Sequence, residues 1–256
     1  MTTNAQLLAA AADVARLAGD VARSHYRANI AVEWKGDGSP VTAADRAAEM
    51  AAREWIGERF ASDAILGEEF GETNAGAARR WILDPIDGTK SFVRGVPLWG
   101  TLVAVCEGET VLAGAAYFPG VDEMVAAAPG EGCWWNGARC RVSSVDRLDR
   151  AAALTTDDRF PDRPDYRPRW QALTSRVAIS RSWGDCYGYL LVATGRAEVM
   201  CDPVMNPWDA AALQPIITEA GGAFTDWGGR ATAFGGDTIA TNGALDAEVR
   251  RILVST

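Results

Sequence analysis

Carboxylate side chains gather in three short segments that lie far apart in the sequence. The segments are Gly67–Gly71 (GEEFG), Trp81–Thr89 (WILDPIDGT) and Pro207–Ala211 (PWDAA). Carboxylate and carbonyl oxygens are the ligands that hard cations such as Mg²⁺ prefer in proteins. If the fold brings the three segments together, they can form an oxygen-ligated metal site.

The second segment combines groups for a cation with groups for an anion. An apolar strand is expected to end at Asp84, and Asp87 and Gly88 then turn the chain into a short helix that begins near Thr89. Asp84 and Asp87 can converge on one point, with the carbonyl of Ile86 as a third oxygen. The amides of Gly88 and Thr89 would lie at a helix start, where backbone donors and the helix dipole favour an anion. This combination predicts metal-assisted phosphoryl transfer to water.

Each segment also has a purely structural interpretation. Asp-Pro and Asp-Gly are common turn formers, and Glu68 with Glu69 could form a solvated turn. Asp209 suits the third position of a helix in which Asn206 is the N-cap and Pro207 the first residue. The three segments taken together favour the functional interpretation more than any one of them does alone.

Composition argues against several other classes of protein. The 256 residues carry a formal net charge of −9, and no basic stripe for a nucleic-acid backbone is visible. His25 is the only histidine, which argues against a histidine-rich zinc site and a phosphohistidine mechanism. The five cysteines show no C-x-x-C spacing and are expected to be free thiols. No apolar run approaches the length of a membrane span, so we expect a soluble, cytoplasmic protein without a membrane partner.

The elements that must position the acidic segments change in character near residue 145. An N-terminal α+β half over residues 1–145 would carry the first two segments. Thr42 and Asp45 have the spacing of a capping box at the start of its second helix. The expected elements are helices Ala5–Arg27 and Thr42–Phe60, strand Ala31–Lys35 with a Gly36–Pro40 turn, strands Ala64–Leu66 and Trp81–Leu83 around a Gly71–Arg80 loop, a hairpin over Leu98–Tyr117, and strands Val125–Ala127, Cys133–Trp135 and Arg139–Val142.

A C-terminal α/β half over residues 146–256 would supply Asp209 and a substrate pocket. Short strands alternate there with helical stretches, which is typical of a layered α/β arrangement. The expected strands are Ala152–Thr155, Val177–Ile179, Ala197–Cys201, Ala223–Thr225 and Thr238–Ala240, and the expected helices are Arg163–Thr174, Cys186–Thr194, Pro207–Ala220 and Leu245–Leu253.

The motifs, in this order, resemble the inositol monophosphatase family. They cover essentially the whole chain: SPVTAAD at Ser39–Asp45, GEE at Gly67–Glu69, WILDPIDGTKSF at Trp81–Phe92, WDAA at Trp208–Ala211, EAGG at Glu219–Gly222 and TNG at Thr241–Gly243. The resemblance implies an α-β-α-β-α layered sandwich of mixed α+β and α/β class. It also implies a homodimer, with two or three Mg²⁺ ions bound between the two halves.

The resemblance further implies roles for individual residues. The metal ligands would be Glu68, Asp84, the carbonyl of Ile86, Asp87 and Asp209. Thr89 and Asp45 match a pair that orients the attacking water, and Glu68 would help to accept the proton of that water. Asp87, Gly88 and Thr89 would contact the phosphate. The D-x-x-D spacing does not fit phosphatases of the haloacid-dehalogenase type, which need a nucleophilic Asp in D-x-D.

The substrate is expected to be a small, cationic phosphate ester. In the family, the leaving-group pocket lies near the helix that follows Arg181–Gly184 and near the residues that precede the WDAA motif. Asp185 and Asp202 stand at these places, and with Arg181 they are the candidate substrate contacts. Carboxylates there would complement an ammonium and an imidazole. Together with Thr89–Gly95, they resemble the actinobacterial-type histidinol-phosphate phosphatases of the family, which implies L-histidinol phosphate as substrate.

Other interpretations remain open at this point. Asp185 could be only a helix N-cap, and Asp202, before Pro203, only a turn residue. Inositol-1-phosphate or another sugar phosphate is the alternative substrate within the family. A non-catalytic protein that binds metal or phosphate is an alternative of a different class.

Overall fold

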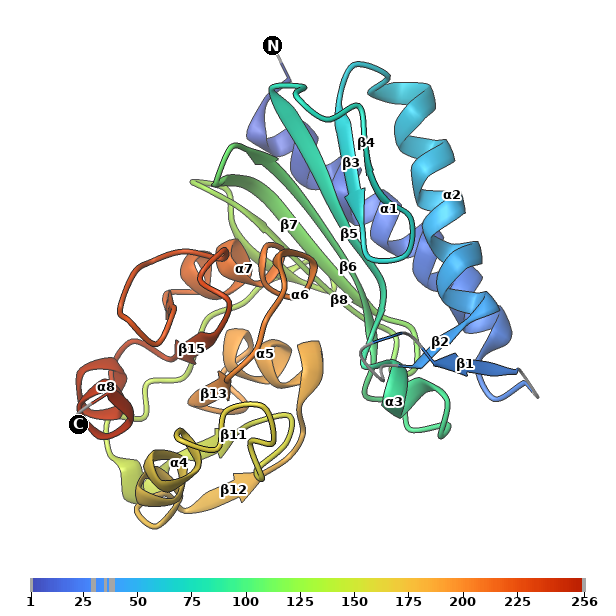
Figure 1. Ribbon diagram of the computed structural model, residues 1–256. Coiled ribbons are helices and arrows are strands. Elements are labelled where there is room, and N and C mark those ends of the chain that lie inside the picture. The colour runs from blue at the N-terminus through green and yellow to red at the C-terminus, as the bar shows by residue number, and fades with distance from the viewer. Residues whose placement is uncertain (1, 29–30, 35, 37–39, 255–256) are drawn as a thin grey trace.

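The computed structural model describes residues 2–28, 31–34, 36 and 40–254 and places helices and sheets in alternating layers (Figure 1). The first layer consists of α1 (Asn4–His25) and α2 (Ala43–Arg59). Both helices begin with a capping box, at Thr3 with Gln6 and at Thr42 with Asp45, so the predicted start of α2 is confirmed.

The second layer is an eight-stranded sheet with the order β10-β9-β8-β7-β6-β5-β3-β4. Its neighbouring strands are antiparallel except for β3 and β5, which are parallel. A separate small hairpin joins β1 (Val32–Trp34) to β2 (Pro40–Thr42). The strands of the large sheet are β3 (Ala64–Gly67), β4 (Gly71–Thr73), β5 (Arg79–Asp87), β6 (Gly100–Glu107), β7 (Thr110–Phe118), β8 (Glu123–Ala128), β9 (Gly132–Trp135) and β10 (Ala138–Arg139).

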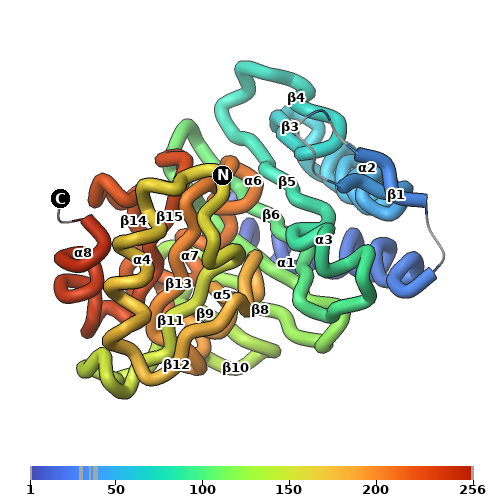
Figure 2. The backbone as a smooth tube through the Cα atoms, turned by 60° about the horizontal axis from the view of Figure 1, so that its bottom comes forward, coloured from blue at the N-terminus to red at the C-terminus, as the bar shows by residue number. Residues whose placement is uncertain are grey.

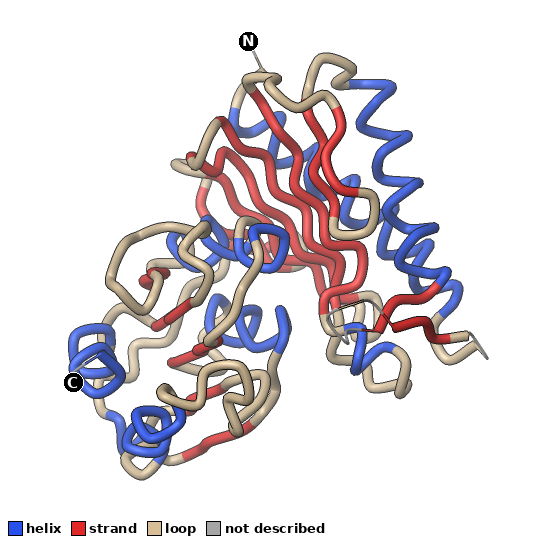
Figure 3. Tube along the Cα trace, in the orientation of Figure 1, coloured by secondary structure: helices blue, strands red, loops and turns tan. Residues whose placement is uncertain are grey.

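Alternating side chains place both faces of the large sheet in hydrophobic cores. Along β6, Val103 and Val105 pack in the cluster that includes the apolar residues of α1 and α2. Leu102 and Ala104 point the other way, into a cluster shared with the middle helices. The period of two along a strand therefore produces a sheet that is covered on both sides (Figure 3).

The middle helices and a second sheet complete the layers. The helices are α5 (Asp185–Ala193), α6 (Pro207–Ala210) and α7 (Leu213–Glu219). The second sheet has the order β12-β11-β13-β15-β14. Its strands are β11 (Ala152–Leu154), β12 (Ile179–Arg181), β13 (Val199–Asp202), β14 (Ala223–Thr225) and β15 (Thr238–Thr241).

The outer face of the second sheet is covered by α4 (Arg167–Thr174) and α8 (Asp246–Val254). Figure 2 shows these elements on the side of the molecule away from α2. The expected α-β-α-β-α sandwich is confirmed. Two short helices, α3 (Thr89–Phe92) and the 3-10 turn η1 (Leu148–Arg150), complete the described elements.

Several expected boundaries were wrong. The Gly71–Arg80 loop contains the edge strand β4, whose exposed residues show no apolar alternation, and β5 continues past Asp84 to Asp87 across an irregularity in its pairing with β6. The predicted Pro207–Ala220 helix is two helices, α6 and α7.

Other expected elements are shorter or shifted. Helix α4 begins at Arg167 rather than at Arg163, β12 lies two residues later than expected, and the expected strand Arg139–Val142 ends at Arg139. Part of the Ala31–Lys35 strand and most of the Gly36–Pro40 turn lie outside the described residues, as does Ser39. The division near residue 145 stays a prediction.

Within the described residues, no helix is both long enough and apolar enough to cross a membrane.

Candidate functional site

The end of β5 and the start of α3 place two carboxylates next to one another. The pairing of β5 with β6 shifts between Asp84 and Asp87, so the chain bulges between these two residues. Asp84 Oδ1 accepts a hydrogen bond from the amide of Ile86 at 3.0 Å. Gly88 follows with a φ of +86°, a left-handed conformation that glycine adopts without strain, and it caps α3. The predicted turn into a helix at Thr89 is confirmed.

A third carboxylate comes from α6, a helix of the middle layer. Asp209 forms the expected capping box with Asn206, whose amide donates to Asp209 Oδ2 at 2.7 Å. Asp84, Asp87 and Asp209 each offer an oxygen within 4.8 Å of the others. Two segments that lie far apart in the sequence thus meet in a group that could hold a metal ion.

The carboxylates of this group repel one another in a buried place. Burial, followed by the charges of Glu68, Asp87 and Asp209, raises the pKa of Asp84 well above its usual range. Burial, followed by the charges of Asp185 and Asp209, does the same to the pKa of Asp87. Burial also raises the pKa of Asp209 to about 6, although hydrogen bonds from Asn206 oppose the shift. Divalent cations would offset this uncompensated negative charge, so the residues present fit such ions.

Glu68 and Asp45 lie beside this group. Glu68 follows β3, its amide donates to the carbonyl of Leu83, and its charge acts on Asp45, Asp84 and Asp209. Asp45 is buried at the start of α2, where Oδ2 accepts from the amide and the hydroxyl of Thr42. Burial raises the pKa of Asp45, while the hydrogen bonds from Thr42 lower it.

Thr89 and Ile86 form a hydrogen bond within the same turn. The hydroxyl of Thr89 donates to the carbonyl of Ile86 at 2.9 Å. The hydrogen bonds of Thr89 and Asp45 thus run to Ile86 and Thr42 in this structure, and their predicted action as a pair stays a prediction.

A cavity of about 240 Å³ opens beside the carboxylate group. Its lining contains Asp87 and Asp209, four further Asp residues, and Lys90 as the one basic side chain among the described lining residues. The full lining is Asp87, Lys90, Thr156, Asp157, Pro161, Asp162, Asp185, Cys186, Tyr189, Asp202, Pro203, Val204, Met205 and Asp209.

The start of α5 connects the cavity to the carboxylate group. The amide of Cys186 donates to Asp87 Oδ2 at 2.5 Å, which ties α5 to β5. Asp185 lies in the cavity wall with a φ of +50°, and its amide donates to Thr156 Oγ1 at 2.8 Å. Burial, followed by the charge of Asp202, raises the pKa of Asp185 to about 7, while Lys90 lowers it. The N-cap of α5 is Gly184, so the capping interpretation of Asp185 was wrong.

The other two candidate substrate contacts differ in their placement. Asp202 lines the cavity but is buried, and it accepts from the amide of Thr156 at 3.0 Å and the hydroxyl of Tyr189 at 3.1 Å. Arg181 is exposed at the end of β12, where its guanidinium donates to the carbonyl of Ser180, outside the described cavity lining.

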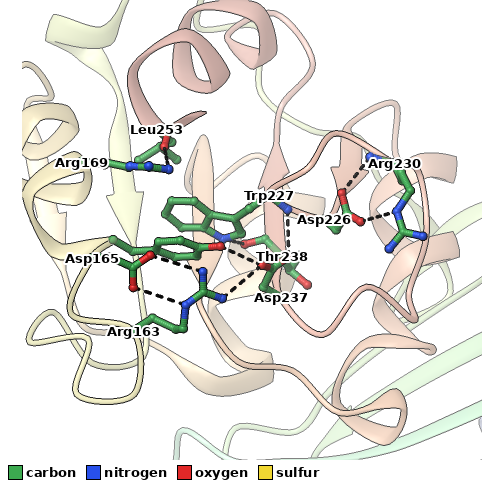
Figure 4. A network of polar contacts seen from close by, with 10 residues as sticks. Arg163, Asp165, Arg169, Asp226, Trp227, Arg230, Asp237, Thr238 and Leu253 are labelled. Carbon is green, nitrogen blue, oxygen red and sulfur yellow. Dashed lines mark hydrogen bonds and ion pairs between the residues drawn. The ribbon is translucent and has the colours of Figure 1, made fainter. Parts of the chain in front are cut away.

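Sequence reasoning missed the part of the cavity wall that comes from residues 156–162. Asp157 is paired there with Arg159, whose Nε lies 2.9 Å from Asp157 Oδ1. The chain directly after this segment, from Arg163, takes part in the polar network in Figure 4. Arg163 lies over the ring of Tyr166, and Tyr166 stacks on Trp227 at 4.0 Å between ring centroids. The overlapping stretch Arg159–Arg169, with three prolines and four arginines, predicts an exposed loop entering a helix, and its composition does not indicate that it would face the site.

The amino-acid sequence matches one protein family and is similar to two named phosphatases. A model of the inositol monophosphatase family matches residues 3–256. A protein named Histidinol-phosphatase from Chlorobaculum parvum is 40% identical, with 96% of this chain and 94% of that protein covered. A Histidinol-phosphatase from the actinobacterium Mycobacterium tuberculosis is also 40% identical, over 86% of this chain and 87% of that protein.

Solved structures agree with the sequence comparison. The extragenic suppressor protein SuhB from Bartonella henselae superposes with a TM-score of 0.91 at 29% sequence identity. The match covers 96% of this chain and 98% of that one.

Proposed function

Because this chain belongs to the inositol monophosphatase family and is a phosphoric monoester hydrolase, we propose that it hydrolyses L-histidinol phosphate with the aid of Mg²⁺. The products would be L-histidinol and inorganic phosphate. The observation that carries the choice of substrate is the acidic cavity wall opposite Asp87 and Asp209. The names of the two histidinol-phosphatase relatives support the same choice. We further propose a cytoplasmic homodimer, as the family resemblance implies.

The charge of the cavity explains the preference for a cation. Once metal ions compensate Asp87 and Asp209, the remaining lining still contains Asp157, Asp162, Asp185 and Asp202 against Lys90. Arg159 partly neutralises Asp157, and Asp202 is hydrogen-bonded to Thr156 and Tyr189. We therefore assign Asp185 to face an ammonium or imidazolium group, because it lines the cavity and the amide of the next residue, Cys186, binds Asp87 in the carboxylate group.

The proposed metal-holding residues are Glu68, Asp84, Asp87, Asp209 and the carbonyl of Ile86. When bound, divalent ions supply positive charge for the phosphate and lower the pKa of a water molecule. The chain itself supplies the preformed geometry. The amide of Ile86 orients Asp84, the amide of Cys186 orients Asp87, and the capping box orients Asp209.

Two further groups would handle the phosphate and the water. The amides of Gly88 and Thr89, at the turn into α3, are proposed to donate to phosphate oxygens. Asp45 and Thr89 are proposed to orient the attacking water, with Glu68 helping to take its proton. Hydrolysis then needs no covalent intermediate on a protein side chain.

The proposal is tested first with a substrate panel. We expect phosphate release from histidinol phosphate to exceed that from inositol-1-phosphate, and both to stop when EDTA removes divalent ions. Equal or better turnover of inositol-1-phosphate would support the sugar-phosphate alternative, which the breadth of the family keeps open. Binding of metal and ester without turnover would instead indicate a non-catalytic binding protein.

Asp185→Asn tests the role of the cavity wall. We expect KM for histidinol phosphate to rise about tenfold or more, since a charge pair is lost, whereas KM for inositol-1-phosphate changes little. Asp158→Asn is the matched control, because Asp158 is exposed on the neighbouring segment outside the cavity lining. Equal effects of Asp185→Asn on both substrates would refute the assignment of a cationic leaving group.

A further inference from the structure

Helix α2 contains a second buried carboxylate, one turn after Asp45. Glu49 has an exposed fraction of 0%. Its Oε2 accepts a hydrogen bond from the amide of Glu69 at 2.8 Å, and its Oε1 accepts one from the amide of Phe70 at 3.2 Å. Glu49 therefore binds the backbone directly after Glu68.

Arg53 hydrogen-bonds both to the Glu49 carboxylate and to the residues that follow Phe70 in the same loop. Its Nε donates to Glu49 Oε1 at 2.8 Å, four residues along α2. Its remaining nitrogens donate to the carbonyl of Gly71 at 2.5 Å and to Thr73 Oγ1 at 3.2 Å. Glu49 and Arg53 together thus bind the turn from β3 to β4 through Glu69, Phe70 and Gly71, and Glu68 lies at the start of that turn.

The turn packs closely against Glu49 at Gly67. A Cβ atom at Gly67 would lie 2.0 Å from Glu49 Oε1, far inside van der Waals contact. The backbone before Glu68 therefore packs directly against the Glu49 carboxylate. Burial of an ion pair has a large desolvation free energy, and apolar side chains of similar volume often stabilise a fold as well or better. Its directed hydrogen bonds, however, define one position for the loop.

We propose that Glu49, which is hydrogen-bonded to Arg53, is a positioning residue: it keeps Glu68 in the position in which Glu68 can bind the divalent ion. The inference rests on the proposed function, in which Glu68 is a metal ligand. Helix α2 would then align two groups of the site at once, Asp45 at its first turn and Glu68 through Glu49. A flexible Glu68 would lose conformational entropy on binding the ion, whereas a positioned one has lost it already.

The test is Mg²⁺ titration of Glu49→Gln by calorimetry, with activity measured in parallel. Glutamine has nearly the same shape as glutamate, but its side-chain nitrogen cannot accept a hydrogen bond from a backbone amide of the loop. We expect the apparent Kd for Mg²⁺ to rise about 10- to 100-fold. We also expect saturating Mg²⁺ to restore most of the lost activity. Glu72→Gln is the matched control, because Glu72 lies on β4 in the same hairpin and forms only a partly exposed ion pair with Arg80.

Two results would overturn the inference. One is an unchanged Kd for Mg²⁺ in a folded Glu49→Gln protein. The other is a loss of thermal stability without metal together with a loss of activity that saturating Mg²⁺ does not restore, which would indicate a purely structural role. If Glu49→Gln does not fold, Arg53→Lys replaces it. Lysine keeps the charge but cannot make the three contacts of Arg53, so we expect the Kd for Mg²⁺ to rise several-fold. An unchanged Kd would again overturn the inference.

Asp84→Asn separates this inference from the function on which it rests. If wild-type protein shows neither Mg²⁺ binding heat nor inhibition by EDTA, the proposed function itself fails. If wild type binds Mg²⁺, Asp84→Asn does not, and Glu49→Gln binds like wild type, only the inference about Glu49 fails.

Discussion

At the scale of single residues, the site is a compromise between folding and function. Asp84, Asp87 and Asp209 are held within 4.8 Å of one another, although the charges of Asp87 and Asp209 raise the pKa of Asp84 and the charge of Asp209 raises the pKa of Asp87. Like charges in a poorly solvated place destabilise the folded chain until a cation compensates them. Their hydrogen bonds from Ile86, Cys186 and Asn206 fix the carboxylates in place without removing the repulsion.

Asp84→Asn should therefore separate stability from activity. Without metal, we expect the variant to be as thermally stable as the wild type or more so, because one buried charge is gone. Its kcat/KM with Mg²⁺ should fall by at least about 100-fold, the scale of losing one electrostatic contact in a transition state. Melting curves and phosphate release measure the two effects. Asp149→Asn is the control, since Asp149 is exposed and pairs only on the surface with Arg147. An Asp84→Asn protein with full activity would contradict the proposed site.

At the scale of elements, helix starts and strand ends carry the site. The end of β5, the start of α2, the start of α3, the start of α5 and the start of α6 all face the same place. Backbone amides are unpaired by the helix itself at such starts, so they can bind carboxylates or anions. The start of α5 is the most constrained of these, because Asp185 has a positive φ and Gly184 packs against Thr156.

Gly184→Ala tests this constraint. The added Cβ would lie 2.2 Å from Thr156 Cα, which is backbone and cannot turn away. We expect α5 to shift, with lower thermal stability and about tenfold or greater loss of kcat/KM as Asp185 and the Cys186 amide move. Gly57→Ala on α2 is the matched control, because a Cβ there meets nothing within 4 Å. It should stabilise the protein by about 0.5–1 kcal/mol. Equal behaviour of the two variants would show that α5 tolerates displacement.

At the scale of the whole molecule, the site joins the large sheet to the middle layer of helices. Asp84 and Asp87 belong to β5 of the large sheet, while Asp209 and Asp185 belong to helices of the middle layer. A cation bound by both sets would link the layers, so its binding free energy adds to the stability of the folded chain.

This linkage predicts a specific pH dependence without metal. Burial raises the pKa of Asp209 from 3.8 to about 6 and that of Asp185 to about 7, so the folded chain binds protons that the unfolded chain has already released. The stability contributed by these groups is therefore lost as pH rises from about 4 to 7. The melting temperature of Asp209→Asn should exceed that of wild type by a margin that grows through pH 6. Saturating Mg²⁺ should close or reverse this margin. A difference in melting temperature that does not change with pH would contradict the proposed repulsion among these carboxylates.

Local patterns in the sequence determined much of the framework. The capping boxes at Thr42 with Asp45 and at Asn206 with Asp209 depend on spacing within one helical turn, and both formed as predicted. The turn from Asp87 through Gly88 into α3 likewise needs only its own residues, because glycine can adopt a positive φ without the strain that a Cβ atom would cause. The order of the acidic motifs across the chain was enough to indicate the layered sandwich, since it matched a known family.

Only the tertiary structure showed which groups act on one another across the fold. In the sequence, Glu49 is one of several polar residues of α2. Its contacts with the amides of Glu69 and Phe70 form only where the β3–β4 turn packs on the helix. The bond from Cys186 to Asp87 and the cavity wall at residues 156–162 likewise join segments far apart in the sequence. Burial and long-range approach decide such roles, and neither is encoded in the spacing of neighbouring residues.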